Sequence, residues 1–301
     1  MVKKISFHIG AHKTGTTHFQ DTLKEIQSKL RQENIHYDSR EEFRKNMEVF
    51  YPWGIKRLLR NVLPFAVTKR IITERILPKV QSWQHFIISE ENIPGSCTDL
   101  LDNNIYINIC ERLKILDFFK DEYEIQILLS IRSFDRVLPG AYVTDLKYRP
   151  DLAISKKESL SKTLNSNNCP SWFELLSRIV AAYPTIPIKV WTQENYKCCS
   201  DNIIKQVLGV KHLSIPNLSP PKATITPDFD VVTKLEVEFK KNKYSYNEWI
   251  NKCDELLSQH PVSNDKQRYT FLSLEQIKIL KKSYLEDLVS IRKKWPNMLI
   301  D

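Results

Sequence analysis

The 301-residue sequence has no long apolar run, few glycines and no CxxC pair among its cysteines. No stretch reaches the roughly 18 consecutive apolar residues of a membrane-spanning helix, so we expect no transmembrane segment. The opening residues, Met1 to Lys4, lead straight into an alternating apolar segment without a signal-peptide core, which argues against secretion by that route. From the cysteine pattern we expect reduced thiols in a reducing compartment, with Cys198 and Cys199 buried.

Acidic residues are fewer than basic ones: the sequence has 36 Asp and Glu and 45 Lys and Arg, which gives a net charge of +9. This surplus favours anionic partners such as phosphates, acidic glycans or a membrane surface. The charge alone would also suit nucleic acid, but the sequence has no recognisable nucleic-acid-binding module, so we expect no such partner. With 42% apolar and 27% charged residues, the composition is typical of a globular protein with a sizeable core.

Short apolar runs alternate with helical repeats along the chain. The runs that we interpret as strands lie at 4–9, 85–88, 124–131 and 186–191. The last contains a proline, which favours an edge strand. Apolar residues at helical spacing lie at 19–30, 172–180 and 277–291, and Ser273 with Gln276 forms a capping box before the last of these.

This alternation predicts an α/β fold with a central parallel sheet flanked by helices. No linker is visible, so we expect a single domain over residues 1–301. The segments 36–80 and 149–170 lack sheet patterning. We interpret them as helical or loop insertions over the carboxyl edge of the sheet, near the expected ligand site, because ligands of such folds bind at that edge.

Glycine is concentrated in one turn. Two of the 6 glycines, Gly10 and Gly15, lie in the segment from Gly10 to Thr17, between the first expected strand and the first helix. A strand, a glycine turn and a helix together present backbone N–H groups and a positive dipole end to an anion. A charge and three hydroxyls are added by Lys13, Thr14, Thr16 and Thr17. The turn therefore predicts a phosphate cradle, with an ordinary threonine-rich helix cap as the alternative.

This cradle is not a Walker A loop, because Thr16 rather than lysine follows the second glycine. We therefore expect it to hold phosphate without a metal. The histidines His8, His12 and His18 straddle a strand, a turn and a helix, and no cysteine or carboxylate cluster joins them, so we expect no metal site there.

The segment Phe7 to Thr17 resembles the 5′-phosphosulfate loop of sulfotransferases that use 3′-phosphoadenosine 5′-phosphosulfate (PAPS), and it is most similar to the bacterial carbohydrate-type branch. Ile127 to Tyr142 resembles a second signature, in which a strand ends in arginine. Ile87 to Asn92 resembles the strand end that carries the catalytic base, and Val190 to Tyr196 resembles a later segment. The resemblance implies a P-loop-NTPase-like sulfotransferase fold with helical insertions.

It also implies a function. A sulfuryl group would pass from PAPS to a hydroxyl of a carbohydrate or glycolipid by in-line displacement, with no metal. Lys13 would offset charge on the bridging oxygen, and Arg132 would bind the 3′-phosphate of the nucleotide. The 5′-phosphate would be held by Gly10, Lys13, Thr14, Gly15, Thr16 and Thr17.

One cofactor-binding position departs from the family. Gly140 stands where a serine usually contacts the 3′-phosphate. Ser133 or Thr144 are candidates to replace the lost hydroxyl, and otherwise PAPS binding is weaker or the donor differs. A non-catalytic nucleotide- or glycan-binding protein of the same fold is therefore the second hypothesis, and a P-loop small-molecule kinase is the third.

For the general base we choose Glu91, with Glu90 second and His12 third. Adjacent residues at a strand end point to opposite sides, so one of the two glutamates is expected to face the donor. The acceptor is not specified by these residues, nor is an oligomeric state. An aromatic and basic set in the first insertion suits either an acidic sugar or a solvated surface: Tyr51, Trp53, Lys56, Arg57, Arg60, Lys69 and Arg70.

Overall fold

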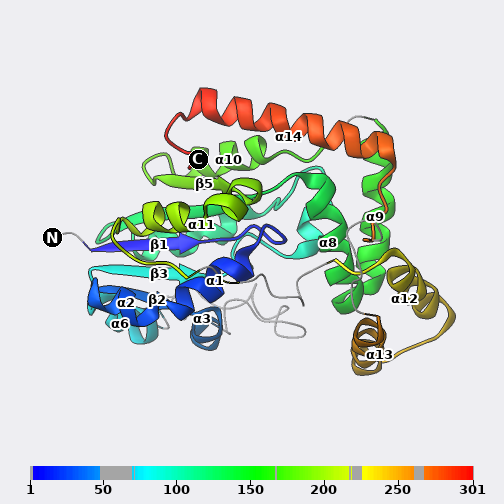
Figure 1. The fold of residues 1–301 in the computed structure, drawn as a ribbon, viewed down its shortest axis with the longest axis horizontal. Helices are drawn as coiled ribbons and strands as arrows, with labels where there is room; N and C mark the ends of the chain where they lie inside the picture. The colour runs from blue at the N-terminus through cyan, green and yellow to red at the C-terminus, as the bar shows by residue number, and fades with distance from the viewer. Residues whose placement is uncertain are drawn as a thin grey trace.

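A parallel sheet forms the centre of the computed structural model, which describes residues 3–47, 70, 72–166, 168–216, 218, 226–260 and 268–300. The strand order is β2-β3-β1-β4-β5, and each neighbouring pair is parallel. Helices cover both faces of this sheet (Figure 1). The predicted α/β class, with a central parallel sheet flanked by helices, is confirmed.

The strands are β1 (Lys4–His8), β2 (Ile35–Asp38), β3 (His85–Ser89), β4 (Glu124–Ile131) and β5 (Ile188–Thr192). The first three predicted runs are β1, β3 and β4, and the proline-containing run is the edge strand β5. The expectation that 36–80 contributes no strand is wrong at its start, where β2 forms the other edge. Ile35 and Tyr37 are buried on one side of β2, but four residues of alternation are too short to stand out in a sequence.

The helices that surround the sheet differ from the expectation mainly at one break. The predicted helix over 19–30 is divided at Ile26 into two shorter helices. The predicted helices over 172–180 and 277–291 are confirmed, the latter with its Ser273–Gln276 capping box. Much of the segment 149–170 is helical. The α-helices are α1 (Thr16–Glu25), α2 (Gln27–Gln32), α3 (Arg40–Met47), α6 (Leu77–Gln81), α7 (Ile109–Arg112), α8 (Phe134–Tyr148), α9 (Pro150–Asn165), α10 (Trp172–Ala182), α11 (Gln193–Leu208), α12 (Phe229–Lys241), α13 (Tyr246–Gln259) and α14 (Leu274–Lys294). Shorter turns of helix lie at Ile72–Ile76, Cys97–Leu100 and Leu113–Phe118.

Each face of the sheet packs against its own set of helices. Phe19 and Leu23 of α1 and Ile203 of α11 belong to one apolar cluster, together with Trp191 of β5. Phe7 of β1 belongs to the larger cluster on the other face, to which α8, α10 and α14 contribute. The alternation of side chains along each strand therefore buries both faces, as is usual for a parallel sheet.

The C-terminal residues pair with the outer edge of β5, the edge that faces away from β4. Val190 donates its N–H to the carbonyl of Met298 at 2.8 Å, and Ile300 donates to the carbonyl of Val190 at 2.7 Å. These bonds pair the edge strand with the segment after α14, which runs along this side of the molecule (Figure 1). The edge is thereby withheld from pairing with other chains.

The helices α12 and α13 pack together beyond α8, away from the sheet (Figure 1). The carboxylate of Glu236 on α12 accepts hydrogen bonds from Tyr142 of α8 at 2.6 Å and from Lys157 of α9 at 2.8 Å. Trp249 of α13 donates to the carbonyl of Leu146 at 2.9 Å. These bonds fix α8, the helix that carries Gly140, between the sheet and the α12–α13 pair.

Two histidines in the sheet predict that the protein loses stability in mild acid. The rings of His8 and His85 hydrogen-bond the hydroxyls of Ser89 and Ser6, each at 2.7 Å, and burial lowers the pKa of each to about 3. Unfolded histidine titrates near 6.5. Between pH 6.5 and 3 the unfolded chain therefore binds protons that the folded chain excludes, and the free energy of unfolding should fall by up to about 1.4 kcal/mol per pH unit for each ring.

Urea unfolding between pH 7.5 and 4.5 measures this effect. His85→Gln, which keeps a hydrogen-bonding side chain beside Ser6, should lose about half of the histidine-dependent slope. A slope identical to that of the wild-type protein would contradict the assignment of His85 as a buried neutral ring.

Candidate functional site

The turn between β1 and α1 has the backbone geometry of an anion cradle. Gly15, the N-cap of α1, has a left-handed backbone (φ 87°, ψ 18°), which glycine adopts without steric cost. Within the described chain, no acceptor takes the backbone N–H groups from Lys13 to His18. This run of donors at the positive end of α1 is therefore available to an anion.

The neighbouring strands hold this turn in place. Ala11 donates its N–H to the carbonyl of Ser130 on β4 at 3.0 Å, and Ser130 donates to the carbonyl of Gly10 at 2.7 Å. On the other side, a Cβ at Gly10 would lie 3.4 Å from the Cα of Glu91, which follows β3. The turn is thus fixed from both flanks before any ligand arrives.

The three threonines of the turn have different roles, which sequence reasoning did not separate. Thr14 is fully buried, and its hydroxyl donates to the carbonyl of Ala11 at 2.6 Å and contacts the hydroxyl of Ser130. It fastens the turn to β4, so the expected phosphate contact is left to its N–H. The hydroxyl of Thr16 donates to Glu91, whereas that of Thr17 has no partner among the described residues.

The side chain of Lys13 lies against α8. A Cβ at Gly140 would be 3.3 Å from both Cγ and Cδ of Lys13, so glycine at this position leaves room for the lysine stem. The ammonium group forms no ion pair or hydrogen bond with the part of the chain that the structure describes. Lys13 is therefore a charge beside the cradle that has no partner among the described residues.

Neither hydroxyl that could replace a serine at Gly140 is free. Ser133 donates its hydroxyl to Asp135, and Thr144 donates its hydroxyl to the carbonyl of Gly140 at 3.0 Å within α8. The suggestion that one of them supplies the missing contact is not supported by this geometry. A threonine in a helix commonly bonds back to the preceding turn in this way.

The two glutamates after β3 point in different directions. Glu91 accepts a hydrogen bond from the hydroxyl of Thr16 at 2.6 Å and so lies beside the cradle. Glu90 is buried and accepts two hydrogen bonds from Arg44 of α3, at 2.5 and 2.8 Å, and two more from Asn92. All its acceptor capacity is directed toward α3 and its own turn, so Glu91 is the better placed base.

His12 belongs to an ordered chain of hydrogen bonds. Asn92 donates its amide N–H to Glu90 at 2.7 Å, which turns its oxygen toward Nε2 of His12 at 3.2 Å. Nε2 therefore carries the proton, and Nδ1 accepts from the hydroxyl of Tyr106 at 2.8 Å. Both ring nitrogens are engaged, which assigns His12 to positioning the turn rather than to proton transfer.

Glu91 is held in its ionised form. Burial raises the pKa of its carboxyl, but the nearby His12, the Thr16 hydroxyl and Lys13 together outweigh this effect, so the pKa lies below its ordinary value. A guanidinium nitrogen of Arg40 on α3 also lies 4.0 Å from Oε1. The group beside the cradle is thus a carboxylate that can accept a proton at neutral pH.

Arg132 lies at the end of β4 and reaches the same turn. Its guanidinium donates to the carbonyl of Lys13 at 3.4 Å, and its own carbonyl accepts from Trp172 at 2.8 Å. Burial lowers the pKa of Arg132, while the charge of Glu194 partly offsets this effect. Arg136, one helical turn further along, is exposed and 3.5 Å from Asp135.

Sequence reasoning missed Gln193, the first residue of α11. Its side chain packs directly over Gly15, so closely that a Cβ there would lie 2.1 Å from Oε1. That oxygen is buried without a hydrogen-bond partner in the described chain. Its position just after β5, at the carboxyl edge of the sheet, is the signal that could have identified it.

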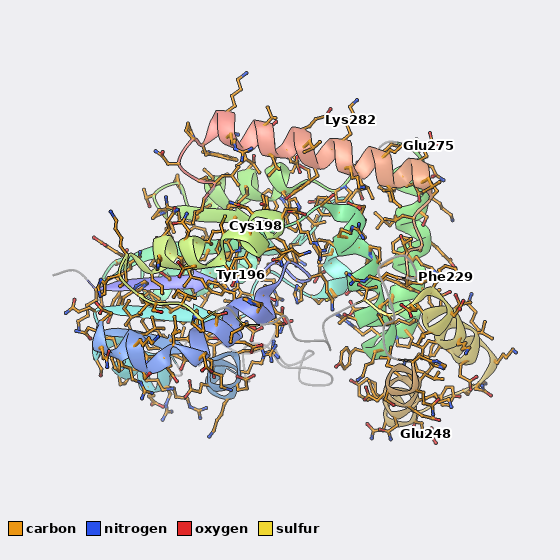
Figure 2. All side chains as sticks on the ribbon, in the orientation of Figure 1. Tyr196, Cys198, Phe229, Glu248, Glu275 and Lys282 are labelled. Atoms are coloured by element: carbon orange, nitrogen blue, oxygen red, sulfur yellow. The ribbon has the colours of Figure 1, made fainter. Side chains whose placement is uncertain are left out.

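The loop histidines do not converge. His8 bonds Ser89, and His18 of α1 bonds the hydroxyl of Tyr196 at 3.1 Å; Tyr196 is labelled on α11 in Figure 2. A different group, His36, Asp38 and Glu42, has ligand atoms within 4.8 Å of one another near the end of β2. The ammonium of Lys79 already lies 3.5 Å from Asp38, which supplies a cation at that place.

Several expectations about surface residues have separate outcomes. The cysteines are free thiols, but Cys198 and Cys199, expected to be buried, are exposed on α11; Cys198 is labelled in Figure 2. Arg70 is exposed and pairs with Glu74 at 2.7 Å. The rest of the suggested acceptor-lining set lies outside the described residues: Tyr51, Trp53, Lys56, Arg57, Arg60 and Lys69.

No family model matches the chain, and no curated protein matches it. Among solved structures, the chain is similar to one from a study of the PezAT chromosomal toxin-antitoxin system of the human pathogen Streptococcus pneumoniae. The sequence identity is 14%, the match covers 86% of each chain, and the TM-score is 0.27, which is too low to support an argument about this protein. Crossing a bilayer would need more length and apolarity than any described helix possesses.

Proposed function

We propose that this protein transfers a sulfuryl group from PAPS to a hydroxyl of a carbohydrate or glycolipid acceptor. The proposal depends on one observation: a backbone anion cradle, the ammonium of Lys13, which has no partner in the described chain, and the ionised carboxylate of Glu91 lie together at the carboxyl edge of the sheet. Transfer from an anionic donor to an alcohol requires a site for the anion, a positive charge that stabilises the leaving group, and a base that takes the proton of the alcohol.

In the proposed reaction, Glu91 takes the proton from the acceptor hydroxyl while the acceptor oxygen forms a bond to sulfur. The bond from sulfur to the bridging oxygen breaks, and its electron pair goes to the 5′-phosphate of the nucleotide. Lys13 and the N–H groups of the cradle offset the charge that develops there. Arg132 is the residue proposed for the 3′-phosphate.

A non-catalytic nucleotide- or glycan-binding protein is the second candidate. It is favoured by the engagement of the two hydroxyls considered for the 3′-phosphate, since Ser133 donates to Asp135 and Thr144 donates to the carbonyl of Gly140. A kinase is disfavoured because the loop has Thr16 where a Walker lysine would stand. The free thiols agree with the cytoplasmic setting that we propose for the reaction.

Calorimetry with 3′,5′-adenosine bisphosphate, with and without magnesium, tests the donor site. We expect magnesium-independent binding at micromolar affinity or better, and labelled-sulfate transfer from PAPS to at least one member of a sugar panel. Binding without any sulfated product would favour the second candidate. Failure of the bisphosphate to bind would contradict the transferase and a nucleotide-binding protein alike.

A further inference from the structure

Thr16 lies between the two halves of the site. It is the first residue of α1, it is buried, and its N–H is one of the cradle donors without an acceptor in the described structure. Its hydroxyl donates to Oε2 of Glu91 at 2.6 Å. One residue therefore contributes its backbone N–H to the cradle and its hydroxyl to the proposed base.

This contact is not a by-product of helix formation. Further along α1, Thr22 uses its hydroxyl in the ordinary way, donating to the carbonyl of His18 at 2.8 Å. Thr14 likewise bonds back to Ala11. Thr16 instead reaches from the first turn of the helix across to the residue that follows β3.

A hydroxyl has a single proton to donate. In the structure, Glu91 accepts a charge-assisted hydrogen bond from this hydroxyl, and such bonds are about twice as strong as neutral ones. A doubly charged phosphate in the cradle would be a second anionic acceptor beside the same oxygen. The two anions then compete for one donor, and whichever loses it is left with a greater affinity for protons.

We propose that the Thr16 hydroxyl passes from Glu91 to the bound donor, so that Glu91 is released as a base only when the cradle is filled. This inference rests on the proposed function. Thr16 is a positioning residue: it couples nucleotide binding to the proton affinity of the carboxylate. Because such coupling is reciprocal, weakening Glu91 as an acceptor should tighten nucleotide binding through Thr16.

A double-mutant cycle measures the coupling, with calorimetric affinity for 3′,5′-adenosine bisphosphate as the readout. Glu91→Gln should tighten binding in the wild-type chain, because a neutral amide competes less for the hydroxyl and a like charge is removed. In the Thr16→Val background, Glu91→Gln still gains affinity from the removal of the like charge. It no longer gains affinity from the competition for the hydroxyl, because the hydroxyl is absent. We expect the gain from Glu91→Gln to be about tenfold smaller in the Thr16→Val background, or about 1.4 kcal/mol of coupling.

Two further variants make the result specific. Thr16→Ser keeps the hydroxyl and should restore the full coupling. If Thr16 had only a structural role, the coupling energies measured with Thr16→Ser and with Thr16→Val would be the same. Thr17→Val removes the neighbouring hydroxyl, which has no partner in the described chain, and should leave the gain from Glu91→Gln unchanged. If Thr16→Val does not fold by circular dichroism, Thr16→Ala replaces it in the cycle.

The failure of this inference differs from the failure of the proposed function. Nucleotide binding with an additive cycle, in which Glu91→Gln gives the same gain with and without the Thr16 hydroxyl, would overturn the transfer of the hydroxyl alone. Absence of binding in the wild-type protein would overturn the proposed function and the inference together. A coupled cycle with serine rescue supports both the donor site and the role of Thr16.

Discussion

Glu91→Gln should lower the rate of sulfuryl transfer by roughly 100- to 10,000-fold, the usual contribution of a general base, while the donor nucleotide still binds. The amide has nearly the same shape and can accept from Thr16, so the turn should keep its structure. It cannot take the proton of an acceptor hydroxyl. Labelled-sulfate transfer gives the rate, and calorimetry with the bisphosphate gives the binding.

Glu90→Gln is the matched control, one residue away and with the same change of charge. Glu90 accepts two hydrogen bonds from Arg44, so its substitution removes one charge of a part-buried ion pair, and we expect a lower thermal midpoint. Turnover of the folded protein should fall far less than in Glu91→Gln. Equal losses of turnover in the two variants, both folded, would contradict the assignment of the base to Glu91.

The position of the site could be predicted because its cues are local. Apolar runs identified β1, β3 and β4, and parallel strands meet at their carboxyl ends. That rule alone brings the turn after β1, Glu91 after β3 and Arg132 at the end of β4 to one edge. Scarce glycine identified the turn, since Gly15 occupies a left-handed position that other residues adopt at a cost.

The partners of each side chain could not be predicted, because they come from residues distant in sequence. The hydroxyl of Thr14 is taken by Ala11, but that of Thr16 is taken by Glu91, and both look alike in the sequence. From the sequence, Gly140 is interpreted as the loss of a serine, whereas the structure shows that the stem of Lys13 packs against it. β2 was missed for a different reason, since an edge strand of four residues gives too short an alternation.

Lys13→Met should weaken binding of the bisphosphate by roughly 10- to 100-fold, the equivalent of a lost charged hydrogen bond of about 1.5–3 kcal/mol. Transfer should slow further, by roughly 100- to 1,000-fold, because the ammonium acts on charge that appears only as the bridging oxygen leaves. Methionine keeps an unbranched stem that can lie against Gly140. The packing of α8 on the turn should therefore survive, and the thermal midpoint should change little.

Lys24→Met separates this local effect from the net charge of +9. Lys24 is exposed in the last turn of the same helix, so its substitution removes one positive charge at a distance from the cradle. Bisphosphate affinity and transfer rate should then match the wild-type protein at 0.15 M salt, where a charge more than about 8 Å away is screened. If Lys13→Met and Lys24→Met weakened bisphosphate binding equally, the net positive charge of the surface would account for the binding. The turn after β1 would then not be a specific nucleotide site.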